Sequence, residues 1–207
     1  MKKKPVRVRY TVRLILCSTA AFLFFSGFHN NPDQKIKPLK FEVKANVAYQ
    51  ELNPGFCWFH PRATVIPGFG QDGKSAVIMT IQKHLMISDF YSGMYYMRTN
   101  DLGNTWSPPV EIPELAWTYE PDSTTVSVAD VTPGWHEKSR KMIAIGIKVR
   151  YNKAGKQLLD KPRSHDAAYA IYDPVKNTWT PWKMIANIPD AVSRFFLVNP
   201  GCVQWLV

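Results

Sequence analysis

Residues 99–106 read Thr-Asn-Asp-Leu-Gly-Asn-Thr-Trp, and they constrain the fold of this chain more than any other segment. Asp101 is placed to accept hydrogen bonds from nearby backbone N–H groups and so to fix a tight turn. Gly103 supplies a positive φ at little steric cost, and Trp106 is expected to fold back as an apolar plug. The flanking runs at 93–98 and 110–112 are typical of strands, so the segment predicts a turn between two strands.

A second stretch repeats this pattern in weaker form. When residues 168–186 are set beneath residues 95–113, the Thr-Trp pair at 178–179 falls under the pair at 105–106. A proline and a lysine replace the aspartate and the glycine of the first turn. This copy therefore keeps the strand–turn–Trp–strand frame and is expected to lack the turn chemistry.

The first segment resembles the Asp box, Ser/Thr-x-Asp-x-Gly-x-Thr-Trp, of sialidase-type β-propellers. All five defining positions match, namely Thr99, Asp101, Gly103, Thr105 and Trp106. In that family the box lies on the outer rim, away from the catalytic face, so it indicates a fold and not a chemistry. The resemblance implies an all-β, sialidase-type β-propeller, which has six blades in the family.

Residues 56–207 are expected to form about two blades and the start of a third, because runs rich in β-branched and aromatic residues recur along them. The first blade is predicted from the runs at 63–66, 75–82, 93–98 and 110–112, with a hairpin turn at 71–74. The second is predicted from those at 124–131, 141–151, 167–172 and 182–185. A third blade is expected to start at 195–198 and 202–207, and the remaining blades are expected beyond residue 207.

The composition agrees with a β-rich globular domain. Hydrophobic residues make up 45% of the chain, which is enough for a sizeable core. The net charge of +10 is concentrated before the first apolar run, at Lys2, Lys3, Lys4, Arg7, Arg9 and Arg13. Without those residues the chain is close to balance. It therefore gives no case for a nucleic-acid partner, which requires a clustered basic face.

Residues 1–31 are interpreted as an N-terminal export signal. A basic head precedes an apolar stretch at 14–28, which is short for a membrane span of ~20 residues and typical of a signal peptide. An uncleaved anchor stays open because no small-x-small cleavage site ends the run, and membrane contact is expected only through this segment. The chain is thus predicted to be periplasmic, cell-surface or secreted. Residues 32–55 read as a linker and lead-in.

The resemblance implies two residues of a catalytic site. The family grips the substrate carboxylate with an arginine on the first inner strand, and Arg62 lies at the matching place, although Pro67 follows it at a distance. A planar guanidinium pairs bidentately with a carboxylate. The family's acid/base aspartate lies in the next long loop, here predicted at 83–92, where Asp89 is the only carboxylate. A structural arginine and a turn-forming aspartate are the alternatives.

A polar-aromatic loop is predicted at 132–137. Trp135 would stack on a sugar face there and His136 would bind a hydroxyl, unless the loop is only a wide hairpin. The family's nucleophilic Tyr–Glu pair and two further arginines come from later blades. The early tyrosines Tyr91, Tyr95 and Tyr96 do not suit that role.

No cofactor and no metal site are expected, because no Cys/His spacing suggests one. Cys57 and Cys202 are interpreted as buried free thiols in strands, with a disulfide between them left open. The expected partner is a sialylated or other acidic glycan, and the expected state is a monomer.

Three functions remain open at this point. The first is an exported glycoside hydrolase that resembles an exo-α-sialidase. The second is a non-catalytic carbohydrate- or protein-binding propeller, because Asp boxes stabilise blades and do no chemistry. The third is an inactive truncated fragment with open sheet edges.

Overall fold

The computed structural model describes residues 39–159, 166–185 and 205. The chain divides into two units, Met1–Ala45 and Asn46–Val207. In the first unit the described residues, 39–45, form no helix or strand. The interpreted signal at 1–31, the expected strand at 195–198 and Cys202 lie outside the described residues. Within the described ranges, no helix is long and apolar enough to cross a membrane.

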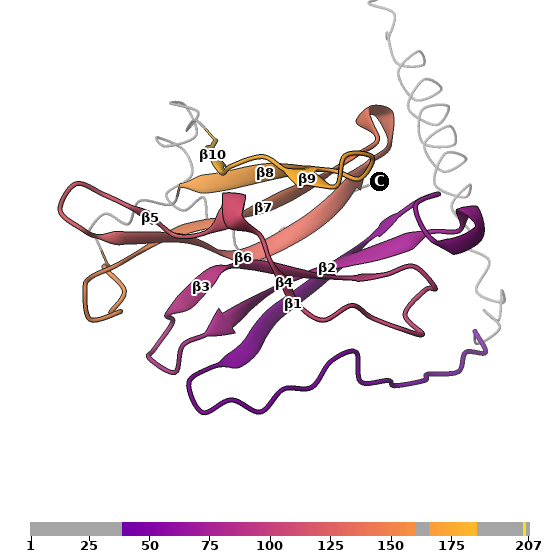
Figure 1. The fold of residues 1–207 in the computed structure, drawn as a ribbon, viewed down its shortest axis with the longest axis horizontal. Helices are drawn as coiled ribbons and strands as arrows, with labels where there is room; N and C mark the ends of the chain where they lie inside the picture. The colour runs from indigo at the N-terminus through magenta and orange to yellow at the C-terminus, as the bar shows by residue number, and fades with distance from the viewer. Residues whose placement is uncertain (1–38, 160–165, 186–204, 206–207) are drawn as a thin grey trace, which may run out of the picture. The chain divides into compact units, whose positions relative to one another are not determined.

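The described strands of the second unit form two antiparallel sheets (Figure 1). The first sheet has the order β1-β2-β3-β4 and consists of Cys57–Ile66 (β1), Ala76–His84 (β2), Tyr91–Thr99 (β3) and Val110–Glu111 (β4). The second has the order β10-β8-β7-β6-β5 and consists of Thr118–Tyr119 (β5), Thr125–His136 (β6), Lys141–Tyr151 (β7), Ala167–Asp173 (β8) and Lys183–Met184 (β10), with Thr178–Trp179 (β9) paired to β8. Short 3-10 helices form at Gln71–Gly73 (η1), Pro113–Leu115 (η2) and Glu137–Ser139 (η3).

The expected all-β class is confirmed. Neither sheet closes on itself within the described residues. Every predicted strand that falls in these residues overlaps an observed one, and the main differences lie at the ends. The first strand starts at Cys57 and not at residue 63, because the chain continues through a bulge that interrupts the sequence pattern.

Strand β7 illustrates why these segments form strands. Its residues alternate between buried and more exposed positions, and Met142 and Ala144 are fully buried on one face. Strand β8 alternates in the same way and buries Ala168, Ala170 and Tyr172. Because successive side chains of a strand point to opposite faces, each strand contributes one apolar face to the core.

The main core cluster takes side chains from both sheets. Its larger members are Ile66, Ile78, Met94, Ile112, Leu115, Met142, Tyr172 and Trp179. Full burial of such a side chain contributes roughly 1.5–3 kcal/mol. The two sheets therefore share one hydrophobic core.

Buried polar side chains add hydrogen bonds between the sheets. Gln82 in β2 is fully buried, and its Nε2 donates to the carbonyl of Ser92 at 2.9 Å and to that of Val128 in β6 at 3.0 Å. The hydroxyl of Ser127 donates to the same Ser92 carbonyl at 3.0 Å. These bonds fix the position of β6 relative to β2 and β3.

The loop predicted at 132–137 is wrong, because β6 continues to His136 and the chain turns only at η3. Pro133 and Gly134 suggested a turn, yet they pair with Ala144 and Ile143 of β7. Among the described strands, the other edge of β6 is paired only near its start, by β5, so the missing N–H of a proline is tolerated there. The indole of Trp205 occupies the space that a side chain at position 134 would fill, which accounts for the glycine.

The Asp-box turn is built on the carboxylate of Asp101. This carboxylate accepts the backbone N–H of Thr105 at 2.9 Å and the hydroxyls of Thr105 and Thr99 at 2.7 Å each. These bonds, with those from Thr105 first in size, lower the pKa of Asp101 to about 2. Gly103 has a φ of 97°. The turn joins β3 to β4, and Asp101 and Gly103 have the hydrogen bonds and the positive φ that the sequence predicted.

The second turn was expected to lack side-chain support, and this is wrong. Asp173, one position before the residue that aligns with Asp101, supports this turn. Its Oδ1 accepts the N–H groups of Val175 at 3.0 Å and Lys176 at 3.3 Å. Asn177 supplies the left-handed residue, with a φ of 54°, and accepts the Tyr172 hydroxyl at 2.7 Å. The sequence alignment hid this replacement because the supporting residues are shifted along the chain.

Candidate functional site

Strands β1 and β6 pack against each other. Each of the two strands contains a β-bulge. The register of β1 with β2 shifts between Phe59 and Arg62, and that of β6 with β7 shifts between Ala129 and Thr132. Within these bulges His60 and Asp130 both have a φ of 53°. A non-glycine residue in this left-handed region costs about 1–3 kcal/mol and is concentrated at functional sites.

The two bulges bring His60 and Asp130 into contact. The Nε2 atom of His60 lies 3.2 Å from Oδ1 of Asp130, and the two side chains are 18% and 30% exposed. Burial lowers the pKa of His60; the carboxylate of Asp130 opposes this effect, and the guanidinium of Arg62 adds to it. The lowered pKa favours the neutral imidazole at neutral pH, and at 3.2 Å its Nε2 atom is placed to donate to the carboxylate when that nitrogen carries the proton.

The other imidazole nitrogen of His60, Nδ1, does not face solvent. It is buried and has no hydrogen-bond partner among the residues that the structure describes. An unpartnered buried polar atom costs about 1–3 kcal/mol. The histidine is thus a poor general base and acts mainly on Asp130.

Asp89 lies in the loop between β2 and β3, within the segment predicted from the sequence. Its carboxylate is exposed and accepts the hydroxyl of Tyr91 at 3.3 Å. Its backbone carbonyl accepts the hydroxyl of Tyr151 in β7 at 2.8 Å. Burial, followed by the charge and the hydrogen bond of Asp89, raises the pKa of Tyr91 to about 12. Tyr91 therefore remains a hydrogen-bond donor to Asp89 over the physiological pH range.

The loop that carries Asp89 is held at both ends. The backbone N–H of Leu85 donates to the carbonyl of Phe90 at 2.9 Å, and the N–H of Phe90 donates to the carbonyl of Ile87 at the same distance. The ring of Phe90 stacks on Trp117 with a centroid distance of 5.2 Å and meets Tyr151 edge-on at 4.8 Å. Aromatic pairs of this kind contribute about 0.5–1.5 kcal/mol beyond their area burial, so the loop is attached to the second sheet.

Arg62 follows directly after the first bulge, where it is half-buried and pairs with Thr80 of β2. Its charge acts on the pKa of His60, as do those of Asp130 and Asp89. Tyr91 lies between His60 and Asp89: its ring centroid is 4.8 Å from that of the imidazole, and its hydroxyl donates to Asp89. Arg62 and Asp89, both predicted from the sequence, thus each act on His60, and their roles toward a substrate remain a prediction.

Trp135 and His136 do not join this group. Tyr151, which binds the Asp89 carbonyl, pairs with Thr125 at the start of β6, whereas His136 pairs with Lys141 at its end. Eleven residues of strand span roughly 35 Å. Trp135 packs against Phe69, and His136 hydrogen-bonds the Ser139 hydroxyl at 2.7 Å. Both residues stabilise the β6–β7 hairpin end.

The sequence reasoning did not single out His60, Asp130 or Tyr91. His60 stands inside the segment that identified Arg62, and Asp130 is a carboxylate inside a predicted apolar strand. A charged residue in such a strand is a usable signal, because it is seldom buried without a partner. The bulges that pair the two residues have no comparable signature.

The expected burial of Cys57 is wrong: it is a free cysteine at the exposed start of β1. A pairing with Cys202 falls outside the described residues. In the part of the chain that the structure describes, no three His, Cys, Asp or Glu side chains form a group that could hold a metal ion.

Comparison with known proteins gives no match to a family model, to a curated protein or to a solved structure. The interpretation of the site therefore depends on its own geometry and on the Asp-box resemblance.

Proposed function

We propose that this chain belongs to a sialidase-type β-propeller glycosidase that removes a terminal sialic acid or a related acidic sugar. The observation that carries the proposal is that the charges of Arg62 and Asp89 both act on His60, which is paired with Asp130 in a strained backbone. Two sheets that share a core and two Trp-containing turns also support it.

The chemistry assigns a role to each of the two residues. The guanidinium of Arg62 binds the carboxylate of the sugar, because its planar fork matches two carboxylate oxygens. Asp89, protonated, donates a proton to the leaving glycosidic oxygen and, once ionised, accepts a proton from water. Tyr91 holds the Asp89 carboxylate through its hydroxyl. The resemblance implies a Tyr–Glu pair from later blades of such a propeller as the nucleophile.

Export over residues 1–31 would bring such an enzyme to extracellular glycans and remains a prediction. The acidic substrate agrees with a guanidinium at the centre of the site. A cofactor has no place in this mechanism.

The experiment measures hydrolysis of a fluorogenic α-sialoside by the full-length protein. Asp89→Asn is expected to lower kcat by about a hundredfold or more, since general acid catalysis contributes about 10²–10⁴. Arg62→Lys keeps the positive charge but loses the planar guanidinium that binds a carboxylate bidentately. It is therefore expected to raise KM more than it lowers kcat. Asp72→Asn, in the exposed turn η1, is the matched control.

Unchanged turnover in both variants would remove the site assignment. Saturable binding of the sialoside without release of product would favour the alternative, a non-catalytic carbohydrate-binding propeller.

A further inference from the structure

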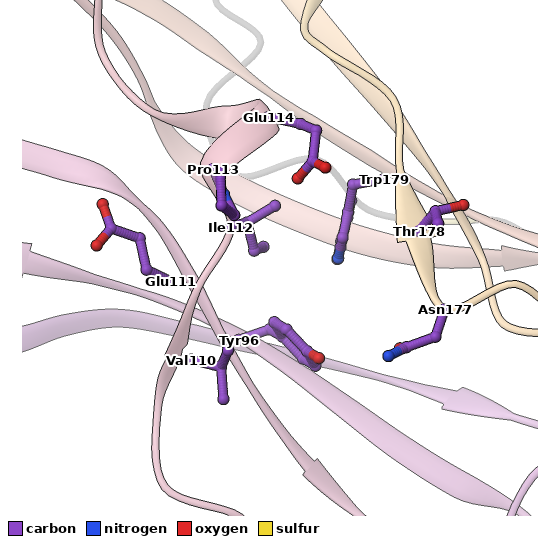
Figure 2. A pocket seen from close by; sticks show the side chains of 9 residues that line it. All are labelled: Tyr96, Val110, Glu111, Ile112, Pro113, Glu114, Asn177, Thr178 and Trp179. Atoms are coloured by element: carbon purple, nitrogen blue, oxygen red, sulfur yellow. The ribbon is translucent and has the colours of Figure 1, made fainter.

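A pocket remote from Arg62 and Asp89 lies between the outer strands of the two sheets. It has a volume of about 200 Å³. One wall comes from β4 and the start of η2, and the other comes from the turn before β9 and from β9 itself (Figure 2). Since β1 and β4 are three strand spacings apart, roughly 14 Å of sheet separates this pocket from the first strand.

Trp179 contributes an unpartnered N–H to this pocket. Its side chain is only 8% exposed, and its Nε1 atom has no hydrogen-bond acceptor in the part of the chain that the structure describes. Figure 2 shows the indole nitrogen at the end of the ring that points into the space between Ile112, Tyr96 and Asn177. By contrast, the indole N–H of Trp117 donates to the Tyr91 carbonyl at 2.8 Å. A buried donor without an acceptor is costly, so a ligand that supplies an acceptor gains binding energy here.

The remaining polar groups of the pocket define what else the ligand must carry. The carboxylate of Glu114 points toward Trp179 from one wall, and the amide of Asn177 points into the space from the other, whereas the carboxylate of Glu111 points away (Figure 2). Carboxylates accept hydrogen bonds and repel anions. A simple cation satisfies them but leaves the indole N–H unpaired. The ligand therefore needs several groups that both donate and accept, and it has no negative charge.

The geometry points to a binding site for one neutral hexose unit. A sugar hydroxyl accepts from Trp179 Nε1, a neighbouring hydroxyl donates to Glu114, and the C–H face of the ring packs against Tyr96. The volume is below the 300–1,000 Å³ of sites for drug-sized ligands, so the pocket takes a single unit and not an extended chain. The site does not depend on the proposed glycosidase activity, because it shares no residue with the Arg62–Asp89 group.

The experiment follows the indole ¹H–¹⁵N resonances of the full chain during titration with the methyl glycosides of galactose, glucose and mannose. The variant Trp179→Phe identifies the resonance of Trp179. At least one hexoside is expected to move this resonance saturably, with a Kd on the order of 1 mM. Glu114→Gln is expected to weaken binding roughly tenfold, because a charged acceptor is replaced by a neutral one. Asp72→Asn makes the same chemical change in the turn η1 and is expected to leave binding unchanged.

Two further probes separate the alternatives. Methylammonium, which has no acceptor, and the methyl glycoside of sialic acid, which is an anion, are both expected to leave the Trp179 resonance unmoved. The proposal is overturned if methylammonium binds as well as the hexosides, which would indicate a cation site. It is also overturned if no hexoside shifts the resonance up to about 50 mM, well above the Kd on the order of 1 mM expected here. Neither result bears on the sialoside assay, so the two proposals fail separately.

Discussion

His60 and Asp130 meet at 3.2 Å, and each occupies the same left-handed conformation in a bulge of its strand. The pair joins two segments that are far apart in the sequence and lies beside Arg62 and Asp89. A bulge redirects the side chain that it carries. The two bulges therefore serve to aim an imidazole and a carboxylate at each other, at a cost in backbone strain.

The first prediction concerns the protonation of His60. In the native protein its pKa is expected below the usual value, because burial outweighs the attraction of Asp130. Removal of that attraction in Asp130→Asn is expected to lower the pKa further, and asparagine tolerates the left-handed backbone. A pH titration of the imidazole resonances by NMR measures both values. A higher pKa in the variant would contradict the assigned pairing.

The pH dependence of stability follows from the same group. Because the pKa of His60 is lower in the folded state, its neutral form favours folding at high pH. This contribution is fully present above the unfolded value of about 6.5 and is lost as the pH falls from there through the lowered pKa of the folded state. Thermal unfolding between pH 8 and pH 5 is expected to show a decline that His60→Gln reduces. An equal decline in the variant would assign the effect to other groups.

Asp101 gives a second pH dependence, at lower pH. Its pKa is lowered from 3.8 to about 2 by the hydrogen bonds of the Asp-box turn. A carboxylate with a lowered pKa stabilises the folded state above its unfolded value, and this stability is lost as the pH falls through the folded value. Asp101→Asn is therefore expected to be less stable than the wild type at pH 7 and nearly equal to it near pH 2, as measured by circular dichroism melts. Asp72→Asn is the control, and a constant difference across the pH range would refute the assignment.

Gln82 tests the contact between the sheets. Gln82→Ala removes two buried hydrogen bonds and leaves the Val128 carbonyl without this donor. The expected loss of unfolding free energy is about 2–3 kcal/mol, measured by denaturant titration. Gln71→Ala, in the exposed turn η1, is expected to change it by less than about 0.5 kcal/mol. Similar losses in the two variants would show that the Gln82 bonds carry no special weight.

Gly155 and Gly73 form a matched pair for the Phe90 contact. Both have a positive φ, 75° and 70°, but a Cβ at 155 would lie 2.7 Å from the ring of Phe90, whereas one at 73 meets nothing within 4 Å. Each Gly→Ala change carries a backbone cost of about 1 kcal/mol. Only Gly155→Ala is expected to lower the free energy of unfolding by more than this backbone cost. It is also expected to shift the backbone NMR resonances of residues 85–90. Equal losses would mean that Phe90 moves aside freely.

Much of the fold could be predicted from the sequence, because it depends on local patterns. Alternating apolar residues marked the strands, and Asp101 and Gly103 marked the Asp-box turn. Pro133 and Gly134 led to a wrong loop prediction. A proline is accepted in β6 because the described strands leave that edge unpaired there, and a glycine is needed because the indole of Trp205 packs against it. The His60–Asp130 pair could not be predicted, because it requires two bulges to meet across separate sheets. Likewise, nothing local marks Trp179 as a donor without an acceptor.

Phe90 fills the space that Gly155 leaves by having no side chain. The loop with the proposed proton donor thus packs against the turn at 152–156 through Phe90. In related chains, we expect insertions or bulkier residues in that turn to coincide with altered sequences at 85–90. Engineering of substrate preference would accordingly have to redesign the two segments as one unit.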